Sequence, residues 1–198
     1  SNANKYLTVL RELGYIERVV PATKQHPERS RRGRYIFTDA YLRFYFRFLR
    51  PYLGDLERGR LNRVVNLLRD HLTDFIGAHT FEELCREWLN EKTDREEFPF
   101  FLDRVGSHWS KDAQIDVVGI NWRTKHILFG ECKWGRQPVE RKVIDYLVRQ
   151  AEKALPSKGN WQPYYIVFSR TPLTTAAQQQ LQAINGLHIP LKQLEADM

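Results

Sequence analysis

Two opposite charges flank a cysteine at the end of an apolar run, in the segment LFGECKWG at residues 128–135. In a strand, side chains alternate between two faces, so Glu131 and Lys133 would point the same way, about 7 Å apart, with Cys132 on the other face. Charged side chains on a partly buried strand need water, an ion pair or a bound ion. This segment is therefore the first candidate for chemistry.

A second acidic residue lies upstream, where two apolar runs are joined by the polar turn NWRTK at residues 121–125. A symmetric hairpin centred on residues 123–124 pairs positions whose numbers sum to 247. Asp116 would then lie across from Glu131, with Cβ atoms about 5 Å apart. Two carboxylates this close repel each other, and burial makes their ionisation costlier, so the arrangement calls for a cation.

Two cations satisfy this requirement, and the residues alone leave both open. Lys133 itself would give a structural ion-pair cluster. A divalent ion such as Mg²⁺ or Mn²⁺ would instead take Asp116, Glu131 and the backbone carbonyl of Cys132 as oxygen ligands, with Lys133 beside a metal-bound water. A metal-bound hydroxide that attacks a phosphodiester is the reaction these groups suit. An E-x-K triplet alone is common by chance; the upstream Asp on a paired strand makes the combination more specific.

The combination of Asp116 with Glu131-Cys132-Lys133 resembles the signature of the PD-(D/E)xK phosphodiesterases, which have the restriction-endonuclease-like fold. Ile115 stands where the name of that signature has Pro. Three segments, FEELCREWL, GSHWSKDAQIDVVGIN and FGECKWG, more closely resemble the C-terminal domain of uncharacterised prokaryotic AAA+-type ATPases. The resemblance covers most of residues 5–190 and is strongest over 80–135.

This resemblance implies a nuclease-like domain that follows a P-loop ATPase domain and a winged helix in the parent protein. ATP would bind only to that ATPase domain, because the chain contains no Gly-rich GKT or GKS loop. In the wider fold a Glu on the first helix often helps to hold the metal. By position that residue is Glu82, with Glu83 as the alternate.

The first third of the chain carries the basic excess, with 14 Lys and Arg against 6 Asp and Glu in residues 1–63 and a net charge of −1 in the remainder. Residues 4–38 read as a helix, a strand, a basic loop and a strand, the back half of a winged helix. Its wing would contact nucleic-acid phosphates, although a merely solvated loop is the alternative. The arginines concerned are Arg29, Arg31, Arg32 and Arg34.

The rest of the chain predicts a helical linker and then an α/β domain. Residues 39–77 are the linker, with Asp39 as a helix N-cap, and residues 78–198 are the nuclease-like domain, whose first helix Thr80 would cap. Strands are expected near 98–104, 114–121, 126–134, 164–169 and 187–191, and helices near 139–155 and 173–184. This order predicts three layers around a mixed sheet. Lys142 and Arg149, on the helix after ECK, could line a nucleic-acid cleft, but helix charges are usually solvated.

Composition excludes several classes of protein. No apolar stretch reaches the 18 to 20 or so residues of a membrane helix and no secretory signal begins the chain, so a soluble cytoplasmic protein is expected. Cys85 and Cys132 are the only cysteines, which argues against structural zinc and a disulfide framework. Ser1-Asn2-Ala3 resembles the scar of a cleaved tag, so we expect a fragment of a longer protein.

Three functional hypotheses follow. The first is a metal-dependent nuclease domain, acting on DNA or RNA and regulated by the parent ATPase, with Asp116, Glu131, Lys133 and Glu82 as its working residues. The second is a catalytically silent module of the same fold that binds nucleic acid or protein and regulates the ATPase. The third is an oligomerisation platform for the ATPase, which would bind neither metal nor nucleic acid.

Overall fold

The computed structural model describes residues 2–198 and divides into two compact units. Unit 1 contains the described residues up to Val20 together with Ser30–Phe75, and unit 2 contains Pro21–Arg29 together with Ile76–Met198. Within the described residues, no helix is both long and apolar enough to cross a membrane.

Unit 1 begins with the predicted helix and strand pair. Helix α1 (Asn2–Glu12) is followed by Gly14 in the left-handed region, at φ +76°, where glycine is favoured because it has no Cβ. Strands β1 (Ile16–Val19) and β2 (Arg34–Phe37) then pair antiparallel. The helix, the two strands and the basic connection between them agree with the predicted order.

The remainder of unit 1 is helical. It runs through α2 (Ala40–Phe44), a π-helical turn (Tyr45–Leu49), a 3₁₀ turn (Arg50–Tyr52), α3 (Leu53–Glu57) and α4 (Leu61–Phe75). Asp39 is the N-cap, because its carboxylate accepts a hydrogen bond of 2.6 Å from the Tyr41 backbone N–H. The ring of Phe48 is buried and packs edge-on against Phe75, with centroids 5.1 Å apart, so these aromatics form a core.

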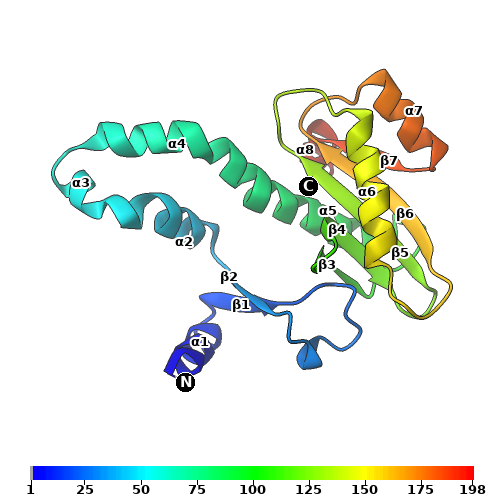
Figure 1. The fold of residues 1–198 in the computed structure, drawn as a ribbon, viewed down its shortest axis with the longest axis horizontal. Helices are drawn as coiled ribbons and strands as arrows, with labels where there is room; N and C mark the ends of the chain where they lie inside the picture. Colours follow the sequence, from blue (N-terminus) through cyan, green and yellow to red (C-terminus); the bar gives the residue numbers. More distant parts are fainter. Residues whose placement is uncertain (1) are drawn as a thin grey trace. The chain divides into compact units, whose positions relative to one another are not determined.

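Unit 2 is built on a five-stranded mixed sheet, as predicted (Figure 1). Its strands lie in chain order: β3 (Arg104–Trp109), β4 (Gln114–Asn121), β5 (His126–Lys133), β6 (Gln162–Ser169) and β7 (Leu187–Pro190). The first three strands pair antiparallel, and β5, β6 and β7 pair parallel.

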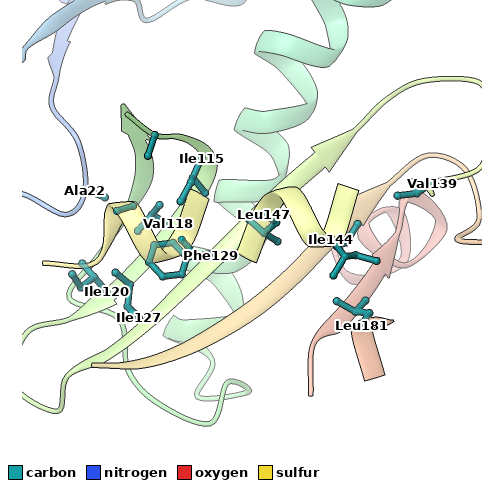
Figure 2. Packing of buried hydrophobic residues seen from close by; sticks show 14 of the residues in the cluster. Ala22, Ile115, Val118, Ile120, Ile127, Phe129, Val139, Ile144, Leu147 and Leu181 are labelled. Atoms are coloured by element: carbon teal, nitrogen blue, oxygen red, sulfur yellow. The ribbon is translucent and has the colours of Figure 1, made fainter. Parts of the chain in front are cut away.

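Helices cover both faces of this sheet. A π-helical turn (Ile76–Phe81) leads into α5 (Glu82–Asp94), which packs on β3 and β4 and contacts α8 (Leu191–Asp197). Helix α6 (Arg141–Ala154) crosses β4, β5 and β6 and packs against α7 (Thr175–Ala183). Each face has its own apolar core. Figure 2 shows the core beneath α6, where Ile144 and Leu147 reach toward the strands.

Three local predictions were wrong. Residues 98–103 form no strand, because Pro99 lacks an N–H and the aromatic side chains pack over the sheet instead: the Phe100 ring lies 4.6 Å from that of Tyr164. The first strand of the sheet starts at Arg104. Thr80 does not cap α5, since helical backbone already runs through Ile76–Phe81. The final helix, α8, was missed.

The first half of the β1–β2 connection belongs to unit 2 and is held against β3. The backbone N–H of Ala22 donates to the carbonyl of Ser107 at 2.8 Å. The hydroxyl of Thr23 lies 2.7 Å from Nδ1 of buried His108. The start of this connection, residues 21–24, is therefore packed on β3, and only the second half of the basic loop lies in unit 1.

Candidate functional site

The hairpin of β4 and β5 has the predicted register. Val117 pairs with Gly130 and Asn121 with His126, so the paired numbers sum to 247. The regular pairing ends at Val117–Gly130, one position before Asp116 and Glu131. The expected neighbourhood of these two carboxylates is correct, although they lie just beyond the regular ladder.

A β-bulge lies at Asp116. Gly106 pairs with Val118 whereas His108 pairs with Ile115, so Ser107 alone stands opposite the two residues Asp116 and Val117. Bulges bend a strand and re-aim a side chain, and they are common beside active sites. Sequence reasoning missed this bulge, because nothing in the apolar alternation of the strand indicates an extra residue.

The carboxylate of Asp116 is turned onto the ECK segment. Its Oδ2 atom accepts a hydrogen bond of 3.0 Å from the backbone N–H of Cys132. This bond holds the acid of one strand against the middle of the E-x-K triplet on the next. The structure thus brings together the residues that the sequence separates by fifteen positions.

Glu131 and Lys133 lie on the same face of β5, as strand alternation predicts. The Lys133 Nζ atom is 2.5 Å from Glu131 Oε1. Glu131 is buried, whereas the Lys133 side chain is 39% exposed, so the lysine can also reach a ligand from solvent. Burial alone would lower the pKa of Lys133, but the contact with Glu131 outweighs it and raises that pKa, so Lys133 carries a proton.

Glu82 joins the site from the first turn of α5. Its Oε2 atom lies 3.4 Å from a guanidinium nitrogen of Arg86, one helical turn later. The same nitrogen donates to the backbone carbonyl of Asp116 at 3.0 Å. Arg86 therefore ties α5 to the bulge. Sequence reasoning missed Arg86, although its i,i+4 spacing from Glu82 was a usable indication.

The three carboxylates act on one another electrostatically. Burial, and then the charge of Asp116, raise the pKa of both Glu82 and Glu131 to about 7. Burial also raises the pKa of Asp116, against the Cys132 N–H and the charges of Lys133 and Arg86, which favour its ionised form. Of the two candidate acids on α5, Glu82 therefore interacts electrostatically with both Asp116 and Glu131.

An oxygen-ligand divalent cation fits this cluster, because concentrated buried negative charge is what such an ion relieves. Within residues 2–198, however, no group of three or more His, Cys, Asp or Glu side chains is arranged to hold a metal. The fitting ligand set is Asp116, Glu131 and the Cys132 carbonyl, completed by water. That composition suits Mg²⁺ or Mn²⁺, which commonly keep several waters.

The thiol of Cys132 takes no part in this set. It lies in the apolar core on the α5 face, beside the thiol of Cys85. Burial, and then the contact with Cys85, raise the pKa of Cys132 well above the usual range, so the thiol stays protonated. Only the backbone of this residue is available to a hard cation.

A groove of about 340 Å³ opens beside the site between β5 and α6. Glu131 and Lys133 line it from the strand, and Lys142, Val143, Tyr146 and Arg149 line it from the helix. Lys142 and Arg149, which sequence reasoning weighted toward simple solvation, therefore lie along one cleft with the central residues of the site.

The four arginines assigned to the wing do not form one group within a single unit. Arg29 ends the short 3₁₀ turn Pro27–Arg29 in unit 2, where its guanidinium lies 3.6 Å from Glu28. Arg31, Arg32 and Arg34 belong to unit 1, and Arg34 opens β2. Their predicted contact with nucleic acid stays a prediction.

Residues 45–144, half of the chain, match the model of the DUF234 family, described as archaeal and bacterial proteins of unknown function. The chain belongs to the DUF234 family. This DUF234 match runs from the π-helical turn Tyr45–Leu49 of unit 1 to the start of α6. It contains all four proposed working residues, Glu82, Asp116, Glu131 and Lys133.

An uncharacterised protein of Methanocaldococcus jannaschii is 28% identical to this DUF234 chain over 172 residues. That stretch is 86% of this chain but only 38% of the relative. The chain therefore spans well under half the length of the curated relative it matches. No solved structure matches the chain.

Proposed function

We propose that unit 2 is a metal-dependent phosphodiesterase domain that acts on nucleic acid. The observation that carries this proposal is the approach of Glu82, Asp116 and Glu131, each with a raised pKa, to Lys133, a half-buried lysine that lines a groove. A chain that keeps buried carboxylates together sacrifices stability, and functional sites are where such arrangements concentrate. The donor set and the E-x-K lysine suit phosphodiester hydrolysis of the PD-(D/E)xK type.

In this proposal each residue has a separate role. Asp116, Glu131 and the Cys132 carbonyl hold Mg²⁺ or Mn²⁺, which when bound neutralises phosphate charge and makes a coordinated water more acidic. Lys133 donates hydrogen bonds to the attacking water from its position beside Glu131. Glu82 contributes negative charge from α5. Arg86 positions the bulge through the Asp116 carbonyl.

We further propose that this activity operates within a longer protein. The chain spans 38% of its archaeal relative, so most of that relative lies outside the aligned region. The resemblance to the C-terminal domains of AAA+-type ATPases supports a parent ATPase that regulates the domain and supplies the ATP site.

A silent binding module is the second candidate, and two observations favour it. Glu131 already has Lys133 as an ion-pair partner at 2.5 Å, and Glu82 has Arg86 at 3.4 Å. Internal cations of this kind can replace a metal. In that case the fold would bind nucleic acid or a protein partner without cleaving, and the site would be a structural ion-pair cluster.

The deciding experiment is calorimetric titration of Mn²⁺ into the chain, into Asp116→Asn, and into Asp112→Asn as the control. Asp112 is an exposed acid in the turn before β4, so its loss removes the same charge outside the site. We expect saturable binding in the wild type and the control, and none in Asp116→Asn. Absence of binding in all three, with and without an oligonucleotide, would favour the silent module.

A further inference from the structure

The groove beside the site is lined on one side by a single face of α6. Lys142, Tyr146 and Arg149 follow one another at intervals of four and three residues, which places them in one stripe along the helix. Ile144 and Leu147, on the opposite side of the helix, are fully buried in the core below. The core therefore fixes which way the stripe faces.

We propose that this stripe is a binding track for one unpaired nucleic-acid strand, with Lys142 and Arg149 contacting phosphates and Tyr146 stacking on a base. This proposal rests on the proposed function, because a strand bound along the stripe would reach Glu131 and Lys133, which line the same groove. Its binding chemistry does not require a metal, so it can be tested separately.

Charge and spacing support an anionic, extended ligand. The residues that line the groove include three cations and one acid. The cations are Lys133, Lys142 and Arg149, and the acid is Glu131. Lys142 also lies 2.9 Å from Glu140, but both side chains are more than half exposed, so this pair is weak and screened. Seven residues of helix separate the outer cations, about 10 Å along the helix axis, so the two side chains would contact different phosphates of one extended strand.

Tyr146 supports an unpaired strand over a duplex. It is 43% exposed although the next residue of the helix, Leu147, is fully buried, so the Tyr146 ring is not required to fill the core. An aromatic face between two cations is the usual platform for unpaired bases, because stacking accepts any base and the cations hold the backbone. Bases of an intact duplex are already stacked and cannot use this ring.

The test is fluorescence anisotropy of a labelled twelve-nucleotide oligo-dT with the full 198-residue chain in EDTA, so that neither metal nor cleavage contributes. The variants are Lys142→Ala/Arg149→Ala, Tyr146→Leu and Tyr146→Phe. Lys111→Ala/Lys192→Ala is the charge-matched control, since both lysines are exposed and lie outside the groove. Thermal melts verify that all variants are folded.

We expect the groove double variant to weaken binding at least tenfold and to reduce the salt slope by about 1.4, or 0.7 per lost phosphate contact. Tyr146→Leu should weaken oligo-dT binding about tenfold while leaving duplex binding unchanged, and Tyr146→Phe should stay within about twofold of the wild type. The control double variant should retain nearly the wild-type slope.

Three results would overturn the track: no oligo-dT binding by the wild type, equal losses in the groove and control double variants, or no effect of Tyr146→Leu. Failure of the nuclease proposal is distinguishable from failure of the track. In that case Asp116→Asn would bind Mn²⁺ no differently from the wild type, while the groove variants would still have reduced affinity for oligo-dT. The groove variants themselves should bind Mn²⁺ like the wild type.

Discussion

At the scale of single residues, the acids of the site lower the stability of the fold, because their charges are partly buried. Glu131 is almost fully buried and interacts electrostatically with Asp116, while the charges of Lys133 and Arg86 favour the ionised acids. Apolar residues would cost less in these positions, because burying charge is unfavourable unless it is fully compensated. The proposed metal would compensate the negative charge of these acids, which explains why acidic residues occupy these positions.

Replacing Lys133 distinguishes metal binding from cleavage. Lys133→Ala should leave Mn²⁺ affinity within a few-fold of the wild type, because the lysine is not a ligand, but should reduce oligonucleotide cleavage at least a hundredfold. Calorimetry and a gel-based cleavage assay measure the two effects. Lys192→Ala, on α8, is the control. Cleavage that survives Lys133→Ala would remove the lysine from the mechanism.

At the scale of elements, three pieces meet at the site. The bulge of β4 turns Asp116 onto β5, the end of β5 supplies Glu131 and Lys133, and the first turn of α5 supplies Glu82. Arg86 joins α5 to the bulge through the Asp116 carbonyl. Helix α6 then forms the other wall of the groove.

The β1–β2 connection is a separate element with its own prediction. Combined replacement of Arg31, Arg32 and Arg34 by Ala should lower the slope of log affinity for duplex DNA against log salt by about one to three units, because each lost phosphate contact removes about 0.9. Anisotropy at several salt concentrations measures the slope. If the slope stays at the wild-type value, the second half of the loop has no part in binding.

At the scale of the whole molecule, the buried acids make stability depend on pH. Glu82 and Glu131 bind protons more tightly in the folded chain, with pKa values near 7 against 4.5 for unperturbed glutamate. Protonation therefore favours folding. The benefit is complete below about 4.5 and is lost as pH rises through 7, a change on the order of a few kcal/mol for the pair.

The thermal midpoints of the wild type and of Glu131→Gln should therefore diverge with pH. In metal-free buffer the melting midpoint of the variant should match that of the wild type near pH 4.5 and exceed it by several degrees at pH 8, because position 131 then carries no buried charge. His188, whose pKa burial lowers, shifts both proteins alike and cancels in the difference. Mn²⁺ should raise the midpoint of the wild type alone at pH 8. A constant gap across this range would refute the raised pKa.

The sequence by itself determined the order of α1, β1 and β2 in unit 1, the order of strands β4 to β7 with helices α6 and α7 in unit 2, and the hairpin register. Apolar alternation with a period of two marks strands β4 and β5, and the polar turn between them leaves little choice of pairing, so the sum of 247 followed directly. The same register predicted from the sequence that Asp116 lies near the ECK segment. The N-cap at Asp39 was likewise a local property of the chain.

Only the tertiary structure decided which distant residues complete the site. The bulge, the tie from Arg86 and the groove wall of α6 depend on how α5, α6 and the sheet pack, which local sequence patterns do not encode. Aromatic packing replaced the strand that the alternation of residues 98–103 predicted, and hydrogen bonds hold residues 22–24 on β3. Local periodicity sets which element forms, whereas the match of buried surfaces sets where its side chains meet.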